Sequence, residues 1–311
     1  MAYDLEMINK RVAADPEGFA LECEGVFNCR VAGAASMIAK RMAKSRVVLL
    51  SGPSGSGKTT TAQKICDALE NLGIHANSIS MDKYFVTPDP ETAPRTASGD
   101  IDKESPYCMD INLLNDHFAM LERGEEIMIP HFNFKTQTQD LSRSVPFKLD
   151  KDEIVVYEGI HALNDMLADP HPEAFKLYIS ARSDFERSGS VCFKRTWVRI
   201  MRRVVRDELF RGTDVADTLR MWANVRRGEK KYISPFKFKA DLLFDSSMEY
   251  EIAVMKSFAL KAFSHMPEDM ERSRELRTLL PVLNEFEELD SAFIPADSIL
   301  REFIGGGKYE Y

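Results

Sequence analysis

The spacing of apolar and polar residues predicts the secondary structure of residues 46–250, where two kinds of pattern occur in turn. Short apolar runs, several of them rich in β-branched residues, predict strands, whereas apolar residues three or four positions apart predict helices. The expected strands are 46–50, 75–81, 125–134, 153–158, 175–180 and 240–245, and the expected helices include 59–72 and 110–123. Strands that alternate with helices favour an α/β fold with a parallel sheet flanked by helices.

The two ends of the chain and one internal loop differ from this pattern. Residues 1–45 predict a charged helical N-terminal extension, and residues 251–311 predict a helical C-terminal tail that packs on the core. The α/β domain is expected over 46–250. Residues 86–106 are rich in Pro, Thr, Asp and Gly and predict a long loop, which in a compact domain is usually functional or mobile.

Composition limits the classes of partner and the compartment. The 311 residues carry 41 basic and 49 acidic side chains, so the net charge of −8 disfavours nucleic acid or an anionic membrane as partners. The five cysteines form no C-x-x-C pair, which indicates reduced thiols in a cytoplasmic protein. There is no apolar signal region and no run of about 18 apolar residues, so we expect neither export nor a membrane anchor.

The stretch "SGPSGSGKTT" at 51–60 is the strongest chemical signal. It contains G-x-x-x-x-G-K-[ST], the phosphate-binding loop (P-loop), between an expected strand and an expected helix. Its glycines let backbone N–H groups surround a phosphate, while the lysine reaches the β- and γ-phosphates and the following threonine ligates Mg²⁺. The predicted nucleotide-binding residues are Gly52, Ser54, Gly55, Ser56, Gly57, Lys58, Thr59 and Thr60.

Two carboxylates follow strands that we expect beside the P-loop. Glu158 follows "IVVY" and is a candidate Mg²⁺ ligand; the alternative is a helix-capping or solvated glutamate. Asp82 follows the strand at 75–81 and is a candidate base for a hydroxyl acceptor; the alternative is a turn former. A base beside an acceptor distinguishes a kinase from a hydrolase, so these residues favour a kinase.

The basic stretch at 193–212 predicts an amphipathic helix within a lid at about 194–235. Its arginines repeat on one face and its apolar residues on another. The arginine column is Arg195, Arg199, Arg202 and Arg206, and the apolar stripe is Val198, Met201, Val205 and Leu209. Something anionic must offset the repulsion within the column. The candidates are acidic residues of the same chain, ATP phosphates and, less favoured, nucleic acid.

These motifs together resemble the uridine kinase and phosphoribulokinase group of P-loop kinases, most closely the bacterial uridine kinase-like nucleoside kinases. "GPSGSGKTT", "SMDKYF", "IPHFNF", "VVYEGIHAL" and "RIMRRVVRDELFRG" occur in the family's order. The resemblance implies a P-loop kinase domain with ATP and Mg²⁺. It makes Asp82 the base and a neighbour of Mg²⁺, Tyr84 a substrate neighbour and Glu158 the second carboxylate at Mg²⁺.

The same resemblance implies further site residues. Arg202 and Arg203 would contact ATP phosphates, Arg206 would act in catalysis and Arg211 would face the substrate. An acidic residue in the loop before 110–123 would hold the ribose, and we expect Asp102, with Glu104 as the alternative.

The expected base pocket departs from the family pattern. A Tyr, a Phe and a His of uridine kinases correspond here to Phe132, Phe134 and Gln137, so a phenol and an imidazole are absent. The two rings can stack on a base, the amide can donate and accept, and His131 adjoins them. Uridine or cytidine is therefore the default acceptor, whereas a purine nucleoside, a sugar phosphate or a pantothenate-like alcohol are alternatives. A non-catalytic nucleotide sensor is the alternative of another class, and homo-oligomerisation stays open.

Overall fold

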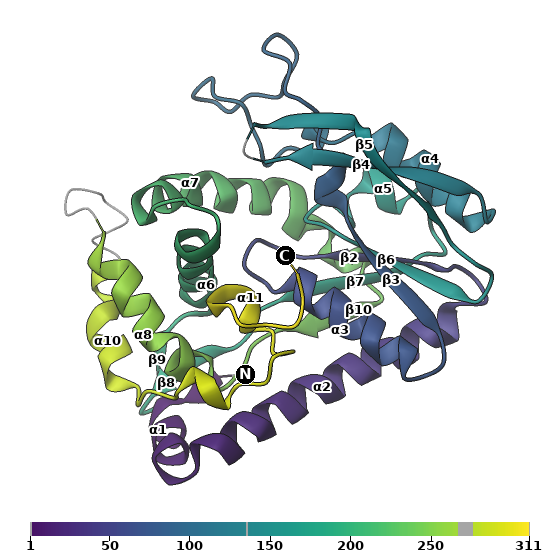
Figure 1. The fold of residues 1–311 in the computed structure, drawn as a ribbon. Coiled ribbons are helices and arrows are strands. Elements are labelled where there is room, and N and C mark those ends of the chain that lie inside the picture. The colour runs from purple at the N-terminus through teal and green to yellow at the C-terminus, as the bar shows by residue number, and fades with distance from the viewer. Residues whose placement is uncertain (1, 135, 267–275, 311) are drawn as a thin grey trace.

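A five-stranded parallel sheet forms the centre of the protein in the computed structural model, which describes residues 2–134, 136–266 and 276–310 (Figure 1). The strands lie in the order β10-β7-β2-β6-β3. Their bounds are β2 (Val47–Ser51), β3 (His75–Ser80), β6 (Glu153–Glu158), β7 (Phe175–Ser180) and β10 (Leu242–Asp245). The predicted parallel sheet is confirmed, and β2, which leads into the P-loop, is its middle strand.

Helices cover both faces of this sheet, as the alternation of strands and helices predicted. Val48 and Leu50 of β2 pack into one core, and Val47 and Leu49 pack into another. The first core includes side chains of α2 (Pro16–Arg41), α3 (Lys58–Glu70), α6 (Arg195–Phe210), α7 (Val215–Gly228) and α8 (Glu251–Ser264). The second core includes side chains of α4 (Ile111–Glu122) and α5 (Asp165–Ala168).

Two small sheets lie outside the central one. β4 (Glu126–Asn133) and β5 (Thr138–Lys148) form an antiparallel hairpin that stands out beside α4 in Figure 1. The strand expected at 125–134 therefore exists but belongs to this hairpin. β1 (Ala2–Asp4), β8 (Asp184–Arg187) and β9 (Ser190–Phe193) form the other sheet. β1, β5, β8 and β9 were not expected.

The terminal segments join the first core of the domain. Phe19 of α2 and Phe303 of the C-terminal tail belong to the same core cluster as the strands. The remaining α-helices within the described residues are α1 (Leu5–Ala14), α10 (Leu279–Glu285) and α11 (Arg301–Ile304). Figure 1 shows α11 beside α6, near the middle of the molecule. The tail thus ends close to the P-loop.

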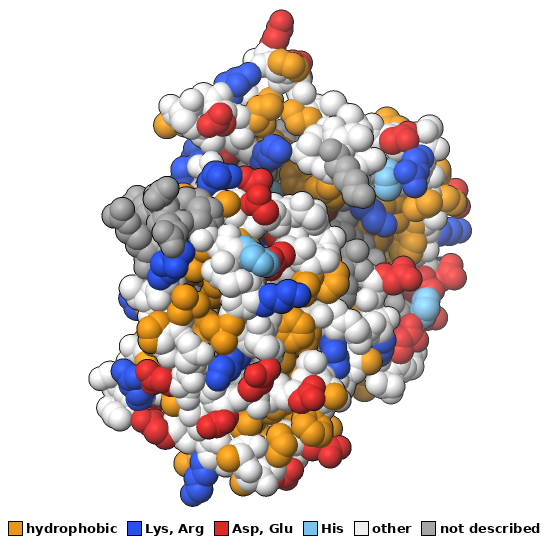
Figure 2. Space-filling model, turned by 60° about the vertical axis from the view of Figure 1, so that its left-hand side comes forward, with side chains coloured by type: hydrophobic (Ala, Val, Ile, Leu, Met, Phe, Trp, Pro, Cys, Tyr) orange, Lys and Arg blue, Asp and Glu red, His pale blue; other side chains and the backbone are white. Residues whose placement is uncertain are grey.

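The surface is mixed in character. Figure 2 shows acidic and basic side chains interspersed on one face, with apolar side chains between them. Among the described residues, no helix has the length and apolar composition needed to cross a bilayer. The five cysteines are free thiols.

Candidate active site

The P-loop connects the middle strand of the sheet to the first turn of α3. Gly55 and Gly57 have φ values of 72° and 79°, in the left-handed region that favours glycine. A Cβ on Gly52 would lie 2.3 Å from the carbonyl oxygen of Ile179. The Ser56 hydroxyl is buried and makes no hydrogen bond within the described part of the chain. A buried, unpaired hydroxyl in a glycine loop fits an anionic ligand such as a phosphate.

Arginines of α6 hold the outer side of the P-loop. Arg199 donates to the Ser54 carbonyl oxygen at 2.7 and 2.9 Å, and Arg202 donates to the Gly55 carbonyl oxygen at 3.2 Å. Arg203 donates to the Ser54 hydroxyl at 2.9 Å. These contacts fix the carbonyl groups on one side of the loop and help to position its backbone.

The arginine column is offset by acidic residues of the same chain. The pairs are Arg195 with Asp184, Arg199 with Glu229, Arg202 with Glu251 and Arg206 with Asp207. Among the alternatives for the column, acidic neighbours are confirmed for these four residues. Leu209, expected in the apolar stripe, is exposed close to the end of α6.

The structure contradicts the prediction that Arg202 contacts ATP phosphates. Its side chain is 0% exposed, and its guanidinium donates to both oxygens of Glu251 and to the Ser246 carbonyl oxygen at 3.0 Å. A charge enclosed in this way requires its partner, because burial without pairing is strongly unfavourable. Arg202 therefore links the P-loop to α8 from within the core.

Arg206 and Arg211 lie nearer the carboxylate that we predicted as the base. Both guanidinium charges lower the pKa of Asp82, although burial outweighs them and raises that pKa overall. Arg206 is mostly buried and lies 3.9 Å from Glu302, whereas the Arg211 side chain is 59% exposed. The two arginines thus bring positive charge to the side of the P-loop that holds Asp82.

Asp82 and Glu158 come together as expected for residues at the ends of adjacent parallel strands. β3 pairs with β6 so that Ser80 lies opposite Glu158, and Asp82 follows in a short 3-10 turn, Met81–Tyr84. Thr59 donates its hydroxyl to Glu158 at 3.3 Å. The structure therefore unites Thr59, Asp82 and Glu158, the three predicted Mg²⁺ ligands.

Burial disfavours the ionised form of both carboxylates, and the charge of Asp82 adds to this effect at Glu158. Burial raises the pKa of Glu158 to about 7; Lys58 opposes the rise and Asp82 adds to it. Burial also lowers the pKa of Lys58, against the effect of both carboxylates. Carboxylate and hydroxyl oxygens are the ligands that Mg²⁺ prefers. The donor set of two carboxylates and a hydroxyl therefore fits a divalent cation.

Asp102, which we predicted to hold the ribose, is already hydrogen-bonded within the chain. Arg227 donates to its two oxygens at 2.6 and 3.1 Å, and the Tyr232 hydroxyl donates at 3.1 Å. Burial would raise the pKa of Asp102, but these partners lower it overall. Glu104, the alternative ribose ligand, is close by: a Cβ on Gly228 would lie 2.3 Å from the Glu104 Cβ. A hydroxyl that binds Asp102 must share it with Arg227.

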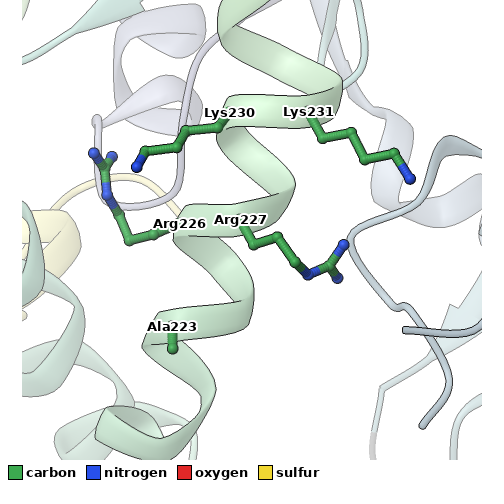
Figure 3. Close-up of a pocket in the computed structure, with 5 residues that line it drawn as sticks. All are labelled: Ala223, Arg226, Arg227, Lys230 and Lys231. Carbon is green, nitrogen blue, oxygen red and sulfur yellow. The ribbon is translucent and has the colours of Figure 1, made fainter. Parts of the chain in front are cut away.

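The end of α7 and the π-helical turn that follows it, Glu229–Ile233, carry the cationic side chains that line one pocket, and these lie on two sides of the helix (Figure 3). Arg226 and Lys230 point to one side, and Arg227 and Lys231 point to the other. Arg226 pairs with Glu229, the partner of Arg199, while Arg227 pairs with Asp102. The end of α7 therefore links Arg199, which binds the Ser54 carbonyl oxygen of the P-loop, to Asp102.

Three phenylalanines form an aromatic cluster beside the β4–β5 hairpin. Phe85, Phe132 and Phe134 have ring centroids 5.0 to 6.0 Å apart, and Phe134 is 55% exposed. His131 lies half-buried next to them on β4. Gln137 has φ 56° and donates its amide to the Phe134 carbonyl oxygen at 2.6 Å. An apolar ring surface is thus available, while the Gln137 amide is engaged in its own turn.

Tyr84 lies in the core, contrary to the prediction of a substrate neighbour. Its side chain is buried, and its hydroxyl contacts His117 Nδ1 at 2.9 Å and the Tyr157 hydroxyl at 3.5 Å. The 3-10 turn explains the difference, because it directs Tyr84 into the core while the preceding Asp82 reaches the site.

Several residues near the site were not identified from the sequence. Arg227 and Tyr232 bind Asp102, and Glu302 contacts Thr60. His161 is fully buried near Lys58 and Asp102, and burial lowers its pKa to about 4, so its imidazole is neutral near pH 7. No local pattern marks Arg227, Tyr232 and Glu302, because they lie 125, 130 and 242 positions from their partners. His161 lies three residues after Glu158, but its burial could not be predicted from the sequence.

Comparison with known proteins assigns the chain to a family. Residues 47–253 match the model of the phosphoribulokinase / uridine kinase family. The chain belongs to this family. Its members' chemistry makes the protein a phosphotransferase with an alcohol group as acceptor.

Individual relatives cover the same region. The chain is 27% identical to the uridine kinase of Halobacterium salinarum over 195 residues, which is 62% of this chain and 77% of the relative. It is 26% identical to the uridine kinase of Macrococcus caseolyticus over 215 residues, 68% of this chain and 94% of the relative. A solved structure, a putative fructose transport system kinase from Silicibacter sp. TM1040, has a TM-score of 0.50 and 19% identity, covering 69% of this chain and 98% of its own. This last likeness shows the P-loop kinase fold alone.

Proposed function

We propose that the protein is an ATP- and Mg²⁺-dependent nucleoside kinase that phosphorylates a 5′-hydroxyl group. The observation that carries this proposal is the position of the Asp82 and Glu158 carboxylates beside Lys58 and Thr59 of the P-loop. A site that only binds a nucleotide has no need of a carboxylate on the acceptor side. The uridine kinases among its relatives support a nucleoside as acceptor.

The roles of the donor-side residues follow from their chemistry. When bound, ATP supplies the phosphoryl group and Mg²⁺ neutralises its charge. Backbone N–H groups of the P-loop and Lys58 would bind the phosphates, and Thr59 and Glu158 would hold the metal ion. Arg203, Arg206 and Arg211 would stabilise negative charge from the side of α6. The proposed nucleotide-binding residues are Gly52, Ser54, Gly55, Ser56, Gly57, Lys58, Thr59, Thr60 and Arg203.

Asp82 would orient the acceptor hydroxyl and accept its proton. Burial raises the pKa of its carboxyl, and a base with a raised pKa holds a transferred proton more readily at neutral pH. The nearby charges of Lys58, Arg206 and Arg211 still favour its ionised form. Asp82 would therefore both bind the acceptor hydroxyl and act as the base that takes its proton.

The acceptor would bind between Asp102 and the aromatic cluster. Phe134 offers exposed ring surface for a planar base, and the largely buried Phe132 packs against it, with His131 next to Phe132 in the sequence. Asp102 would bind ribose hydroxyls, for which it has to share its oxygens with Arg227. Uridine or cytidine is the proposed acceptor. The free cysteines support a reducing compartment, which we propose to be the cytoplasm.

ADP release from ATP and Mg²⁺ tests this proposal. Purified protein is assayed with uridine, cytidine, adenosine, guanosine, ribulose 5-phosphate and pantothenate, with a reaction without acceptor as control. Stimulation by uridine or cytidine is the expected result. Stimulation by another alcohol alone would overturn the pyrimidine assignment, and ATP binding without stimulation by any acceptor would favour a nucleotide sensor.

A further inference from the structure

The C-terminal segment, residues 297–309, places a carboxylate on the first turn of α3. Glu302 accepts a hydrogen bond from the Thr60 hydroxyl at 2.8 Å and one from the Thr60 backbone N–H at 3.3 Å. The Glu302 side chain is largely buried, and 242 residues separate it from Thr60. The end of the chain therefore reaches directly into the predicted nucleotide site.

Thr60 occupies a position where a P-loop protein binds phosphate. It follows Lys58 and Thr59 at the N-terminus of α3, where backbone N–H groups and the helix dipole favour an anion. A glutamate carboxylate resembles a phosphate in its negative charge and in its acceptor oxygens. The second Glu302 oxygen lies 3.9 Å from Arg206, so the same carboxylate also approaches a proposed catalytic cation.

Packing fixes the segment along α3. A Cβ on Gly57 would lie 2.2 Å from Ile299 Cδ1, so the tail rests directly on the last glycine of the P-loop. Lys64 pairs with Asp297 at 2.6 Å, and Asp67 accepts from Lys308 at 2.6 Å. The buried apolar side chains of the segment are Ile299, Leu300, Phe303 and Ile304. Glu302 is thus held against Thr60 by contacts on both sides of it.

We propose that Glu302 occupies part of the donor-phosphate site and competes with the phosphates of the nucleotide. Binding of the donor then requires the carboxylate to leave Thr60, and Arg206 exchanges Glu302 for the phosphate. The C-terminal segment thereby sets the affinity of the kinase for its donor. This inference rests on the proposed function, because it requires that the P-loop binds a nucleotide.

Calorimetric titration with ATP, ADP, AMP and adenosine tests the competition. In Glu302→Gln the charge is removed from Thr60 with little change of shape, and we expect the Kd for ATP to fall roughly tenfold. Glu302→Asp, in which the side chain is shorter by one methylene group, should also lower the Kd for ATP. The Kd for adenosine should stay unchanged in both variants, since adenosine carries no phosphate.

A matched control uses the other carboxylate that the segment places on α3. Asp297→Asn removes the ion pair with Lys64, one turn beyond Thr60, and should leave the Kd for ATP unchanged. Thermal unfolding of each variant without ligand establishes that it is folded before titration. An unchanged or higher Kd for ATP in folded Glu302→Gln and Glu302→Asp would overturn the competition. Absence of nucleotide binding in every form, wild type included, would overturn the proposed function itself.

Hydrogen exchange of the wild-type protein gives a second readout that does not depend on substitutions. If ATP displaces Glu302, amides of residues 299–304 should exchange faster with ATP than without it, while amides of α2 should not change. Slower exchange of residues 299–304 with ATP would show that the segment closes on the nucleotide, and it would contradict the proposed competition.

Discussion

Glu158 should make the stability of the protein depend on pH near neutrality. Burial and the charge of Asp82 raise its pKa from 4.5 to about 7. Because this pKa is higher in the folded state than in the unfolded chain, the protonated carboxyl stabilises the fold. That contribution is fully present below about pH 4.5 and is lost as the pH rises through about 7. Each pH unit corresponds to about 1.4 kcal/mol, so the loss amounts to at most roughly 3 kcal/mol.

The substitution Glu158→Gln removes this contribution. Urea unfolding in EDTA, from about pH 5 to about pH 8, should show that the free energy of unfolding falls by up to roughly 3 kcal/mol more in wild type than in the variant. The substitution also changes the pKa of Asp82, because it removes the Glu158 charge. The difference in pH dependence between wild type and variant therefore measures the titration of the carboxylate pair. Mg²⁺ should reduce the fall in wild type, because it stabilises the ionised pair.

The control is Glu288→Gln, which changes an exposed glutamate far along the chain. Its stability profile should follow that of wild type. Parallel profiles for wild type and Glu158→Gln would refute the argument, because they would show that Glu158 is ionised in the folded protein well below neutral pH.

Three further substitutions test other parts of the site. Asp82→Asn should keep nucleotide binding in calorimetry and lower phosphoryl transfer by about 100-fold or more, and transfer near the wild-type rate would exclude Asp82 as the base. Arg202→Gln should lower the free energy of unfolding by about 3 to 5 kcal/mol in urea, because Glu251 would be left buried without its partner; unchanged stability would contradict the structural role. Gly57→Ala should weaken nucleotide binding at least roughly tenfold, since its Cβ would meet Ile299 at 2.2 Å and its φ is 79°; wild-type affinity would contradict the close packing.

Much of the central fold could be predicted because the three middle strands of the sheet are buried on both faces. β2 and β6 appear in the sequence as continuous apolar runs, and the P-loop marks the turn from β2 into α3. β5 could not be predicted in the same way. Its side chains are mostly exposed or half-buried, so they have no apolar alternation, and the strand exists only because β4 pairs with it.

The positions of the proposed catalytic side chains were predictable to the extent that the topology brings them together. Asp82 follows β3 and Glu158 is the last residue of β6, and the carboxyl ends of these adjacent parallel strands meet at one edge of the sheet. The contact partner of a side chain could not be predicted in this way, because periodicity shows which face of a helix a residue occupies but not what packs against that face. Arg202 lies on the predicted face of α6, yet it meets Glu251, 49 residues away, and is enclosed. Glu302 reaches Thr60 by the same kind of distant contact.

Transfer of label from γ-labelled ATP to a nucleoside is the most direct test of the proposed kinase activity. Purified protein is incubated with labelled ATP, Mg²⁺ and uridine or cytidine, and the products are separated, with the Asp82→Asn variant as a matched control. We predict label in the nucleoside 5′-monophosphate with wild type and its loss with the variant. Label that appears only in inorganic phosphate, at equal rates with and without nucleoside, would contradict a nucleoside kinase.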